Sequence, residues 1–461
     1  NLTSVFMPLI TNVPNSAFQS CTRLTGINMT LFTTVGTSSF SNCASFKNVV
    51  LPIVTSLGAS AFSSCSQLIS VHMPLMTSVG NNAFQSCTSL TSMNMTLFTS
   101  VGSSSFSGCT AFTTVDLPIV TSLGSYAFSS CSNLVSVDVP LLTSIGSSAF
   151  QSCVNLSSVN LTHLTKVDTS AFSGWTGLTA MDLPLVTSLG SSAFSSCSNL
   201  VSVKLPLVTS VGEYAFKSCS SLTGVNLTQL TSVQYRAFDG WSGLTAIDLP
   251  NVTTLGSYAF SSCTNLVRVN LPSVTFIGSY SFRYCSSLTG VNLTQLTYVG
   301  SNAFYAWTGL TTMDLPLVTN MGSNAFTSCS NLVSVDLPLI SNIGSNAFQS
   351  CTSLTSFNAP GLIVFPASLV HIGTSAFYQC TGLKGDLVIP MSVTRVDSYA
   401  FYQCKGLFFG PVVEFINATV SSTAFYQCCS STAEPSGQPS GQPTDQPSSV
   451  PTAHVCQTKD D

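Results

Sequence analysis

Apolar residues recur at fixed positions within a unit of 22 residues along most of the chain. The clearest example is a column of phenylalanines spaced 22 residues apart: Phe18, Phe40, Phe62, Phe84, Phe106, Phe128, Phe150, Phe172, Phe194, Phe216, Phe238, Phe260, Phe282, Phe304, Phe326 and Phe348. Phe377, Phe401 and Phe425 continue the column at longer spacings. A fixed period of this length is typical of a solenoid, because a single unit cannot bury its own apolar face and must stack on its neighbours. The pattern therefore predicts a repeat solenoid of about 19 rungs.

The unit at 134–153, "LVSVDVPLLTSIGSSAFQSC", predicts the elements of one rung. Val137 and Val139 alternate with polar residues, which is the pattern of a half-buried strand. Pro140 follows and ends the strand, because proline cannot donate to the ladder of hydrogen bonds. Phe150 and Cys153 are three residues apart, as one turn of α-helix or 3₁₀-helix requires if both are to point inward. We therefore expect a parallel β-sheet face and short helical or 3₁₀ turns.

The pattern divides the chain into three parts. Residues 1–351 hold the regular units, whereas residues 352–429 hold irregular rungs that begin with seven extra residues around "APGLIVFPA". We expect these irregular rungs to cap the solenoid. Residues 430–461 form a tail rich in Pro, Ser, Gly and Gln. Such a composition cannot build a core, so the sequence predicts an extended, polyproline-like C-terminal tail.

The repeat unit L-x-x-V-x-L-P-x-x-T-x-I-G-x-x-A-F-x-x-C resembles the BspA-like class of leucine-rich repeat, and "AFYQCTGLKGDLVIP" at 376–390 is especially similar to it. The resemblance extends from residue 1 to about residue 429. It implies a leucine-rich-repeat fold and a secreted or surface protein, with adhesion as the usual role and no associated catalytic residues. The P-S-G-Q strings of the tail resemble stalks of algal and other protist extracellular proteins. The units of this chain are unusually regular, which favours a structural role.

A second period of 66 residues lies over the first, because threonine replaces the proline of every third rung and asparagine stands two residues earlier. Each such rung carries an N-x-T acceptor sequence for N-linked glycosylation, at Asn28, Asn94, Asn160, Asn226 and Asn292. We predict a column of glycans on the outward side of the strand face, about 14 Å apart. The alternative is that asparagine merely suits an exposed column and threonine merely replaces proline in the turn. Four further acceptors lie off this column, at Asn1, Asn155, Asn251 and Asn417.

Sixteen of the eighteen cysteines lie three residues after the column phenylalanine, and Trp175, Trp241 and Trp307 replace cysteine in every third rung there. Rungs ~4.8 Å apart bring neighbouring Cα atoms within the range of a disulfide. We predict disulfides between adjacent rungs, with a ladder of buried reduced thiols as the alternative. The tryptophans either fill the core or form a ligand platform, and we favour the core. The disulfide candidates are Cys65, Cys87, Cys131, Cys153, Cys197, Cys219, Cys263, Cys285, Cys329, Cys351, Cys380 and Cys404.

Composition narrows the classes of function. Only 6% of residues are charged and the net charge is -4, so no basic surface indicates nucleic acid or an anionic membrane. No apolar run approaches the ~20 residues of a membrane span. The four histidines are scattered and no base recurs near the serines, so we predict no enzyme, no cofactor and no metal centre. The outward aspartates are interpreted as a solvated polar ladder rather than a calcium site: Asp116, Asp138, Asp182, Asp248, Asp314 and Asp336.

We therefore predict a non-enzymatic extracellular structural glycoprotein, either secreted or at the cell surface. The first residues are already in register with the repeat, and "NLTSVFMP" aligns with "NLVSVDVP" at 133–140, so neither a secretory signal nor an N-terminal cap is seen. We expect the first rung to dock on the C-terminal rungs of another copy, giving a head-to-tail fibre or coat. The expected partners are itself, covalent glycans and other surface or matrix proteins. The alternative is a monomeric adhesin or receptor that binds a protein or glycan through its strand face.

Overall fold

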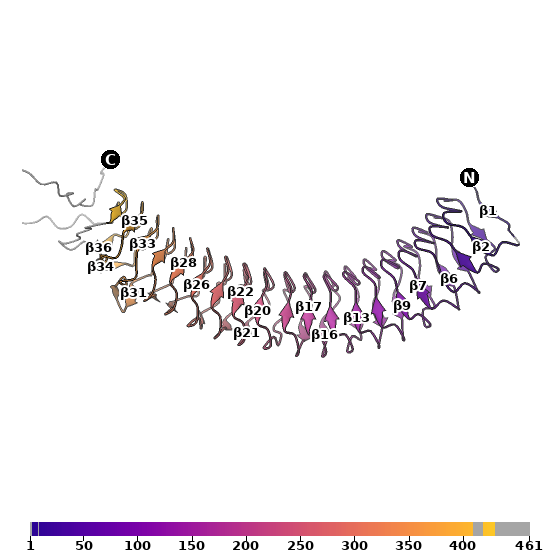
Figure 1. Ribbon diagram of the computed structural model, residues 1–461, viewed down its shortest axis with the longest axis horizontal. Coiled ribbons are helices and arrows are strands. Elements are labelled where there is room, and N and C mark those ends of the chain that lie inside the picture. The colour runs from indigo at the N-terminus through magenta and orange to yellow at the C-terminus, as the bar shows by residue number, and fades with distance from the viewer. Residues whose placement is uncertain (1, 8, 409–417, 429–461) are drawn as a thin grey trace, which may run out of the picture. The chain divides into compact units, whose positions relative to one another are not determined.

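The computed structural model describes residues 2–7, 9–408 and 418–428. Over these residues the chain forms a parallel β-solenoid of about 18 turns, which confirms the predicted repeat solenoid. The chain falls into two compact units, residues 1–270 (unit 1) and 271–461 (unit 2). Within each unit the strands follow one another rung by rung in chain order (Figure 1). The predicted tail at 430–461 lies outside the described residues.

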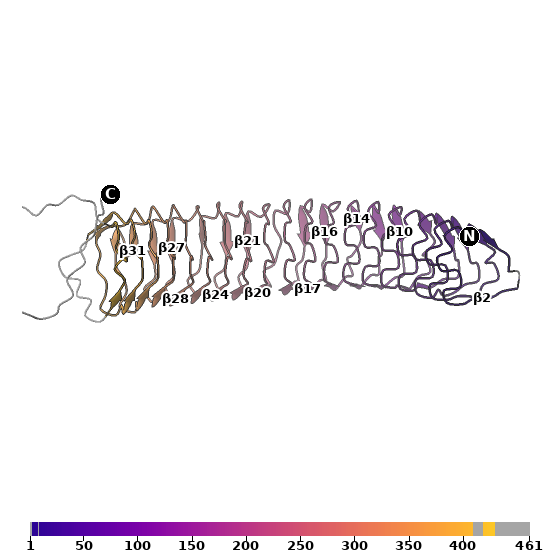
Figure 2. The same cartoon turned by 90° about the horizontal axis from the view of Figure 1, so that it is seen from above.

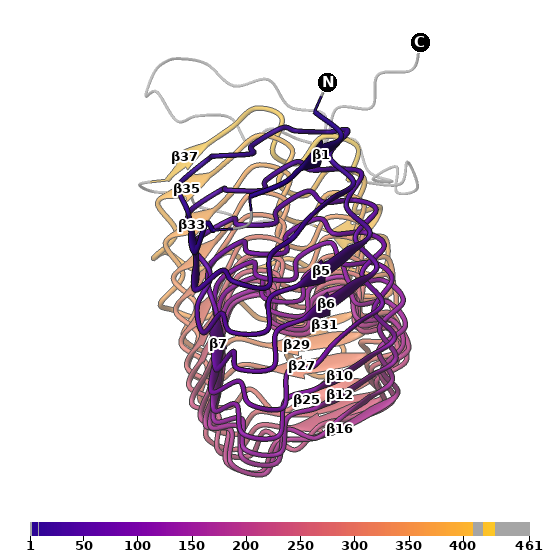
Figure 3. The ribbon, with the colours of Figure 1, turned by 90° about the vertical axis from the view of Figure 1, so that its right-hand side faces the viewer.

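The rungs of unit 1 carry two short strands, which pair in parallel with the equivalent strands of neighbouring rungs. The first ladder comprises β1 (Ser4–Val5), β3 (Gly26–Ile27), β5 (Asn48–Val50), β6 (Ser70–His72), β8 (Ser92–Met93), β10 (Thr114–Asp116), β12 (Ser136–Asp138), β14 (Ser158–Val159), β16 (Ala180–Asp182), β18 (Ser202–Lys204), β21 (Ala246–Asp248) and β23 (Arg268–Asn270). The second ladder comprises β2 (Asn12–Val13), β4 (Thr34–Val35), β7 (Ser78–Val79), β9 (Ser100–Val101), β11 (Ser122–Leu123), β13 (Ser144–Ile145), β15 (Lys166–Val167), β17 (Ser188–Leu189), β19 (Ser210–Val211), β20 (Ser232–Val233) and β22 (Thr254–Leu255). Figures 2 and 3 show the two ladders on different sides of the rungs.

The register of the ladders follows the repeat. In β12, Val137 pairs with Val115 of β10, one unit of 22 residues earlier. Val137 is buried, whereas Ser136 and Asp138 on either side of it point outward. Identical positions of successive units therefore lie side by side, and the alternation read from the sequence is the inward and outward alternation of the first ladder.

The A-F-x-x-C segment of each rung is not helical, and no helix occurs within the described residues, so the predicted helical or 3₁₀ turns are not confirmed. Around Phe62, Ser60 and Ser64 have positive φ angles of 57° and 61°. The backbone N–H groups of these three residues donate to the next rung, at distances of 2.9, 2.8 and 2.7 Å. The N–H groups between them bond three residues back within their own rung. Because alternate donors serve the neighbouring rung, this segment forms a third hydrogen-bonded side of the stack instead of a helix.

Unit 2 continues the same plan with one interruption. Its first-ladder strands are β25 (Gly290–Val291), β27 (Thr312–Asp314), β29 (Ser334–Asp336) and β31 (Ser356–Ala359), followed by β32 (Leu362–Ile363), β34 (Lys384–Asp386) and β36 (Gly406–Phe408). Its second-ladder strands are β24 (Phe276–Ile277), β26 (Tyr298–Val299), β28 (Asn320–Met321), β30 (Asn342–Ile343), β33 (His371–Ile372), β35 (Arg395–Val396) and β37 (Thr419–Val420). The interruption is a hairpin, because β32 pairs antiparallel with β31 across a register shift at Phe357 and Asn358. The seven extra residues of the sequence build this hairpin.

Phenylalanine forms the axis of the core in both units. Phe62 and Phe84 stack with ring centroids 5.6 Å apart and planes 3° from parallel, and Phe326 and Phe348 stack at 5.2 Å and 4°. These rings are fully buried. Each rung thus buries its aromatic side chain against identical neighbours, which supplies the apolar contact that a single rung lacks.

Candidate functional site

The five column acceptors, four in unit 1 and Asn292 in unit 2, are exposed, and each lies directly after the first-ladder segment of its own rung. Asn28, Asn94, Asn160 and Asn292 follow β3, β8, β14 and β25, which have two residues each, whereas the described rungs with an aspartate in this column have strands of three residues. Asn226 follows a single bridge at Val225. The acceptor asparagines therefore lie outside the ladder, on the outward side predicted for the glycan column.

The acceptor threonine explains why the strand stops early. Oδ1 of Asn28 accepts hydrogen bonds from the backbone N–H of Thr30 at 3.1 Å and from its hydroxyl at 2.8 Å. The same pair of bonds recurs in the other four rungs, with hydroxyl distances of 2.8 to 3.1 Å. This is an Asx turn, in which the side chain replaces a backbone partner. Within the described part of the chain no hydrogen bond engages the Nδ2 atoms of these asparagines, and Nδ2 is the atom to which an N-linked sugar is attached.

The off-column acceptors differ from this arrangement. Nδ2 of Asn251 donates to the carbonyl oxygen of Thr228 at 2.8 Å, so it is already engaged with the neighbouring rung. Asn155 is exposed. Asn1 and Asn417 lie outside the described residues. The column asparagines thus differ from Asn251 in the hydrogen bonding of Nδ2, the atom to which the sugar would be attached.

Within the described residues the column cysteines are buried apart from the half-buried Cys21, and the buried ones include all twelve disulfide candidates. The thiol of Cys87 donates to the carbonyl oxygen of Phe62, the column phenylalanine of the preceding rung, at 3.1 Å. The thiols of Cys109 and Cys153 likewise donate to the carbonyl oxygen of the column phenylalanine one rung before their own. Loss of solvation on burial raises the pKa of Cys87 and Cys153 to about 12, although a backbone hydrogen bond opposes the shift. Thiolates are the reactive form, so these cysteines are protected while the rungs are folded. Pairing between adjacent rungs stays a prediction.

The tryptophans are core residues. Trp175, Trp241 and Trp307 are fully buried, and their indole N–H groups donate to the carbonyl oxygens of Leu156, Leu222 and Leu288. No face of these rings is open to a ligand, since each is packed against the column phenylalanines. The interpretation as core filler is correct, and the ligand platform is not.

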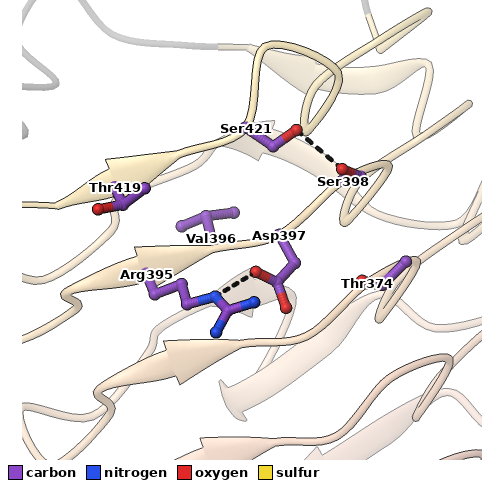
Figure 4. A pocket seen from close by; sticks show the side chains of 7 residues that line it. All are labelled: Thr374, Arg395, Val396, Asp397, Ser398, Thr419 and Ser421. Carbon is purple, nitrogen blue, oxygen red and sulfur yellow. Dashed lines mark hydrogen bonds and ion pairs between the residues drawn. The ribbon is translucent and has the colours of Figure 1, made fainter.

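A cavity of about 310 Å³ lies on the second ladder of unit 2, lined by Thr374, Arg395, Val396, Asp397, Ser398, Thr419 and Ser421 (Figure 4). Asp397 accepts from Nε of Arg395 at 2.5 Å and lies 3.0 Å from Nε2 of His371. Burial opposes ionisation of Asp397, but the hydrogen bonds and charges of His371 and Arg395 outweigh it and lower the pKa of the carboxyl group. His371 contacts a carboxylate and not a serine, while Ser398 and Ser421 bond each other at 2.9 Å. This arrangement stabilises the rungs and offers no activated nucleophile.

A second cavity, of about 460 Å³, lies on the first ladder of unit 2 beside the β31–β32 hairpin. Asp314 and Asp336 of the outward aspartate column line it. Elsewhere in this column Asp182 pairs with Lys204 at 3.3 Å, and Asp248 accepts from Asn270 at 2.6 Å. Among the described residues no group of three or more His, Cys, Asp or Glu side chains is arranged to hold a metal ion. Sequence reasoning missed this cavity, because only the extra residues between Phe348 and Phe377 signalled a break in the repeat.

Comparison with known families and structures agrees with this architecture. The model of the family described as "BspA type Leucine rich repeat region (6 copies)" matches residues 1–113, 99–223, 187–305, 275–408 and 361–433. A leucine-rich repeat protein from Bacteroides ovatus is 28% identical over 76% of this chain and 89% of its own, with a TM-score of 0.57. A leucine rich cell surface protein from Faecalibacterium prausnitzii is 22% identical over 77% of this chain and 87% of its own, with a TM-score of 0.36. A search of curated proteins finds no match.

Stacked parallel rungs with a buried ladder of leucine, phenylalanine and cysteine define a leucine-rich-repeat solenoid. The matched segments extend over residues 1–433, and the chain belongs to the BspA-type leucine-rich repeat family. This confirms the family resemblance of the repeat unit. Proteins of this repeat class are generally not enzymes. None of the described residues forms a helix that is long and apolar enough to span a membrane.

Proposed function

We propose that the chain is a non-enzymatic, N-glycosylated protein of the cell surface or extracellular space, and that copies of it associate into a fibre or coat. The observation that carries the proposal is the register of the five exposed acceptors, which occupy the same position in every third rung. In those rungs the threonine both completes the acceptor sequence and donates a hydrogen bond to Oδ1 of the asparagine. Glycans at this spacing would also keep a nearly uncharged surface hydrated, since only 6% of the residues are charged.

Association of copies is supported by an apolar ridge on unit 1. The residue after the proline or threonine of each rung is leucine or isoleucine in six successive rungs, and each of these side chains is 41 to 49% exposed: Leu31, Ile53, Leu75, Leu97, Ile119 and Leu141. A row of this kind exceeds the scattered apolar residues of an ordinary surface. Since its members are evenly spaced, an identical ridge on a second copy would interdigitate with it. The proposed association also includes the head-to-tail contact expected from the sequence, in which the first rung of one copy docks on the C-terminal rungs of another.

The test is the state of association of the purified protein, followed by analytical ultracentrifugation and electron microscopy. We expect concentration-dependent oligomers or filaments. The variant Leu75→Ser/Leu97→Ser should weaken lateral association. Thr77→Ser/Thr99→Ser, at exposed residues directly before β7 and β9, is the control and should not. Monodisperse single chains at every concentration would contradict self-association and favour the second candidate.

That second candidate is a surface protein that binds a partner through its strand face. The cavity beside the hairpin favours it, because the β31–β32 hairpin walls the first-ladder face there.

A further inference from the structure

The column of glycan acceptors ends where the hairpin begins. A sixth acceptor is expected at Asn358, 66 residues after Asn292, but Pro360 stands where threonine would be needed. Asn358 has a φ of 58° and is the residue at which the register shifts. Its Oδ1 accepts from the backbone N–H of Leu337, and its Nδ2 donates to the carbonyl oxygen of Val364 at 3.0 Å. The asparagine thus closes the hairpin and presents no free amide for a sugar.

The face that remains bare is hollowed. The cavity of about 460 Å³ has the outward residues of β27 and β29 as its floor, and Asn358, Ala359, Pro360 and Gly361 of the hairpin line it. The hairpin is closed by a bond of its own, because the backbone N–H of Gly361 donates to the hydroxyl of buried Ser356 on β31 at 2.8 Å. It adjoins the floor through β31, which pairs in parallel with β29. A cavity of this volume has the size of a small-ligand site or of a cleft for two or three residues of a peptide.

The floor of the cleft carries uncompensated negative charge. Asp314 and Asp336 occupy the same position in adjacent strands and pair in register. Neither forms an ion pair with a cation among the described residues. Burial and then the charge of Asp314 raise the pKa of Asp336, so a nearby cation would stabilise its ionised form.

Unit 1 contains a matched pair of aspartates in a run of regular rungs, without an adjoining hairpin. Asp116 and Asp138 pair in the same register on β10 and β12. The next rung there continues regularly with β14 and carries the acceptor Asn160. The two aspartate pairs occupy the same position of the repeat and pair in the same register. A difference in binding between variants of the two pairs therefore reports the contribution of the hairpin.

We propose that the cleft formed by β27, β29 and the β31–β32 hairpin binds a lysine or arginine side chain on an extended segment of a partner protein. The charge of the floor is complementary to a basic group, and the hydroxyls of Thr312 and Ser334 lie beside the carboxylates as further acceptors. The apolar side chains that also line the cleft, such as Val333, would contact the methylene stem of a lysine or arginine. This inference goes beyond the proposed function and does not depend on self-association, because the cleft lies within unit 2.

The test measures binding of a fluorescein-labelled deca-lysine peptide to the full chain by fluorescence anisotropy at low salt. Asp314→Asn/Asp336→Asn should weaken binding about tenfold or more, whereas Asp116→Asn/Asp138→Asn should change it little. Ser334→Trp fills the cleft without removing charge and should also weaken binding, with Ser136→Trp on β12 as its control. The same peptide with acetylated lysines should not bind.

Equal losses from the two aspartate pairs would overturn the proposal, because they would show a diffuse acidic face rather than a cleft. Unchanged binding in Ser334→Trp, or equal binding of the acetylated peptide, would also overturn it. None of these outcomes bears on the state of association, so a failure of this inference is distinguishable from a failure of the proposed function.

Discussion

In every third rung, two buried positions three residues apart hold either a cysteine and a phenylalanine or a tryptophan and a leucine, so that one of the two side chains is always a large aromatic. Where the cysteine column holds Trp175, Trp241 or Trp307, the residue three positions later is leucine. Where equivalent rungs keep Cys43 and Cys109, that residue is phenylalanine, at positions 46 and 112. All of these side chains are at most 2% exposed. The rungs between them combine cysteine with leucine, so every third rung needs one additional aromatic ring and has two ways to place it.

This exchange predicts the result of a double-mutant cycle. Trp175 packs 5.2 Å from Phe172 and 6.1 Å from Phe150, between ring centroids. Trp175→Cys removes these contacts and the indole hydrogen bond, and should cost about 3 to 4 kcal/mol of the free energy of unfolding. Leu178→Phe alone overfills the rung and should cost about 1 to 3 kcal/mol. The double variant recreates the pairing of the Cys109 rung, where the ring of Phe112 lies 5.6 Å from that of Phe106.

The double variant should therefore be more stable than Trp175→Cys alone, with a coupling energy of about 1 to 3 kcal/mol. The assay is urea unfolding followed by circular dichroism at a common protein concentration. Leu200→Phe, in a neighbouring rung that holds Cys197, is the control, and it should show no coupling with Trp175→Cys. Additive costs in the Trp175 and Leu178 cycle would refute the idea that the two positions share one volume.

Three further predictions test the core, the ion pairs and the thiols. Phe194→Ala should cost about 3 to 5 kcal/mol in urea unfolding, because it interrupts a stack of fully buried rings, and a cost near zero would contradict the phenylalanine axis. Because the pKa of Asp397 is lowered in the folded state, its ionised form stabilises the protein above pH 3.8, the ordinary value, and this stability is lost as the pH falls through the lowered pKa. Asp397→Asn should therefore destabilise the protein at neutral pH, and the difference in unfolding free energy between the variant and the original protein should close in acid. A difference that stays constant with pH would argue against this role of Asp397. If adjacent cysteines are oxidised as the sequence predicts, the unfolded, unreduced protein should titrate fewer than eighteen thiols, and a full count would exclude the disulfides.

The buried and exposed positions of the strands were predictable from the sequence, because equivalent residues of successive units occupy the same environment. The alternation around Val137 predicted the first ladder, since inward and outward positions of a strand differ in polarity. The spacing of Phe150 and Cys153 suggested a helix, but Ser148 and Ser152 have φ angles of 57° and 59° and their N–H groups bond the next rung. Three-residue spacing cannot distinguish the two conformations, because both bring these side chains inward. Hydrogen bonds between rungs, which a single unit does not reveal, decide the outcome.

The candidate surfaces were predictable to different degrees. The acceptor column followed from the sequence because N-x-T is a local signal, and its exposure is a property of the strand position. The cleft did not, since it depends on a hairpin that turns back on β31 and on the aspartates of two earlier rungs. The same residues, Asp314 and Asp336, look like any other members of the aspartate column when only the sequence is read.

The measurement that tests the account most directly is glycopeptide mapping of the protein purified from its source. Enzymatic removal of N-linked sugars in heavy-oxygen water would mark each occupied asparagine by mass. We expect sugar at Asn28, Asn94, Asn160, Asn226 and Asn292, and an unmodified Asn251, whose Nδ2 donates to the carbonyl oxygen of Thr228. Bare asparagines throughout the column, or sugar at Asn251 with the column unmodified, would contradict the central claim.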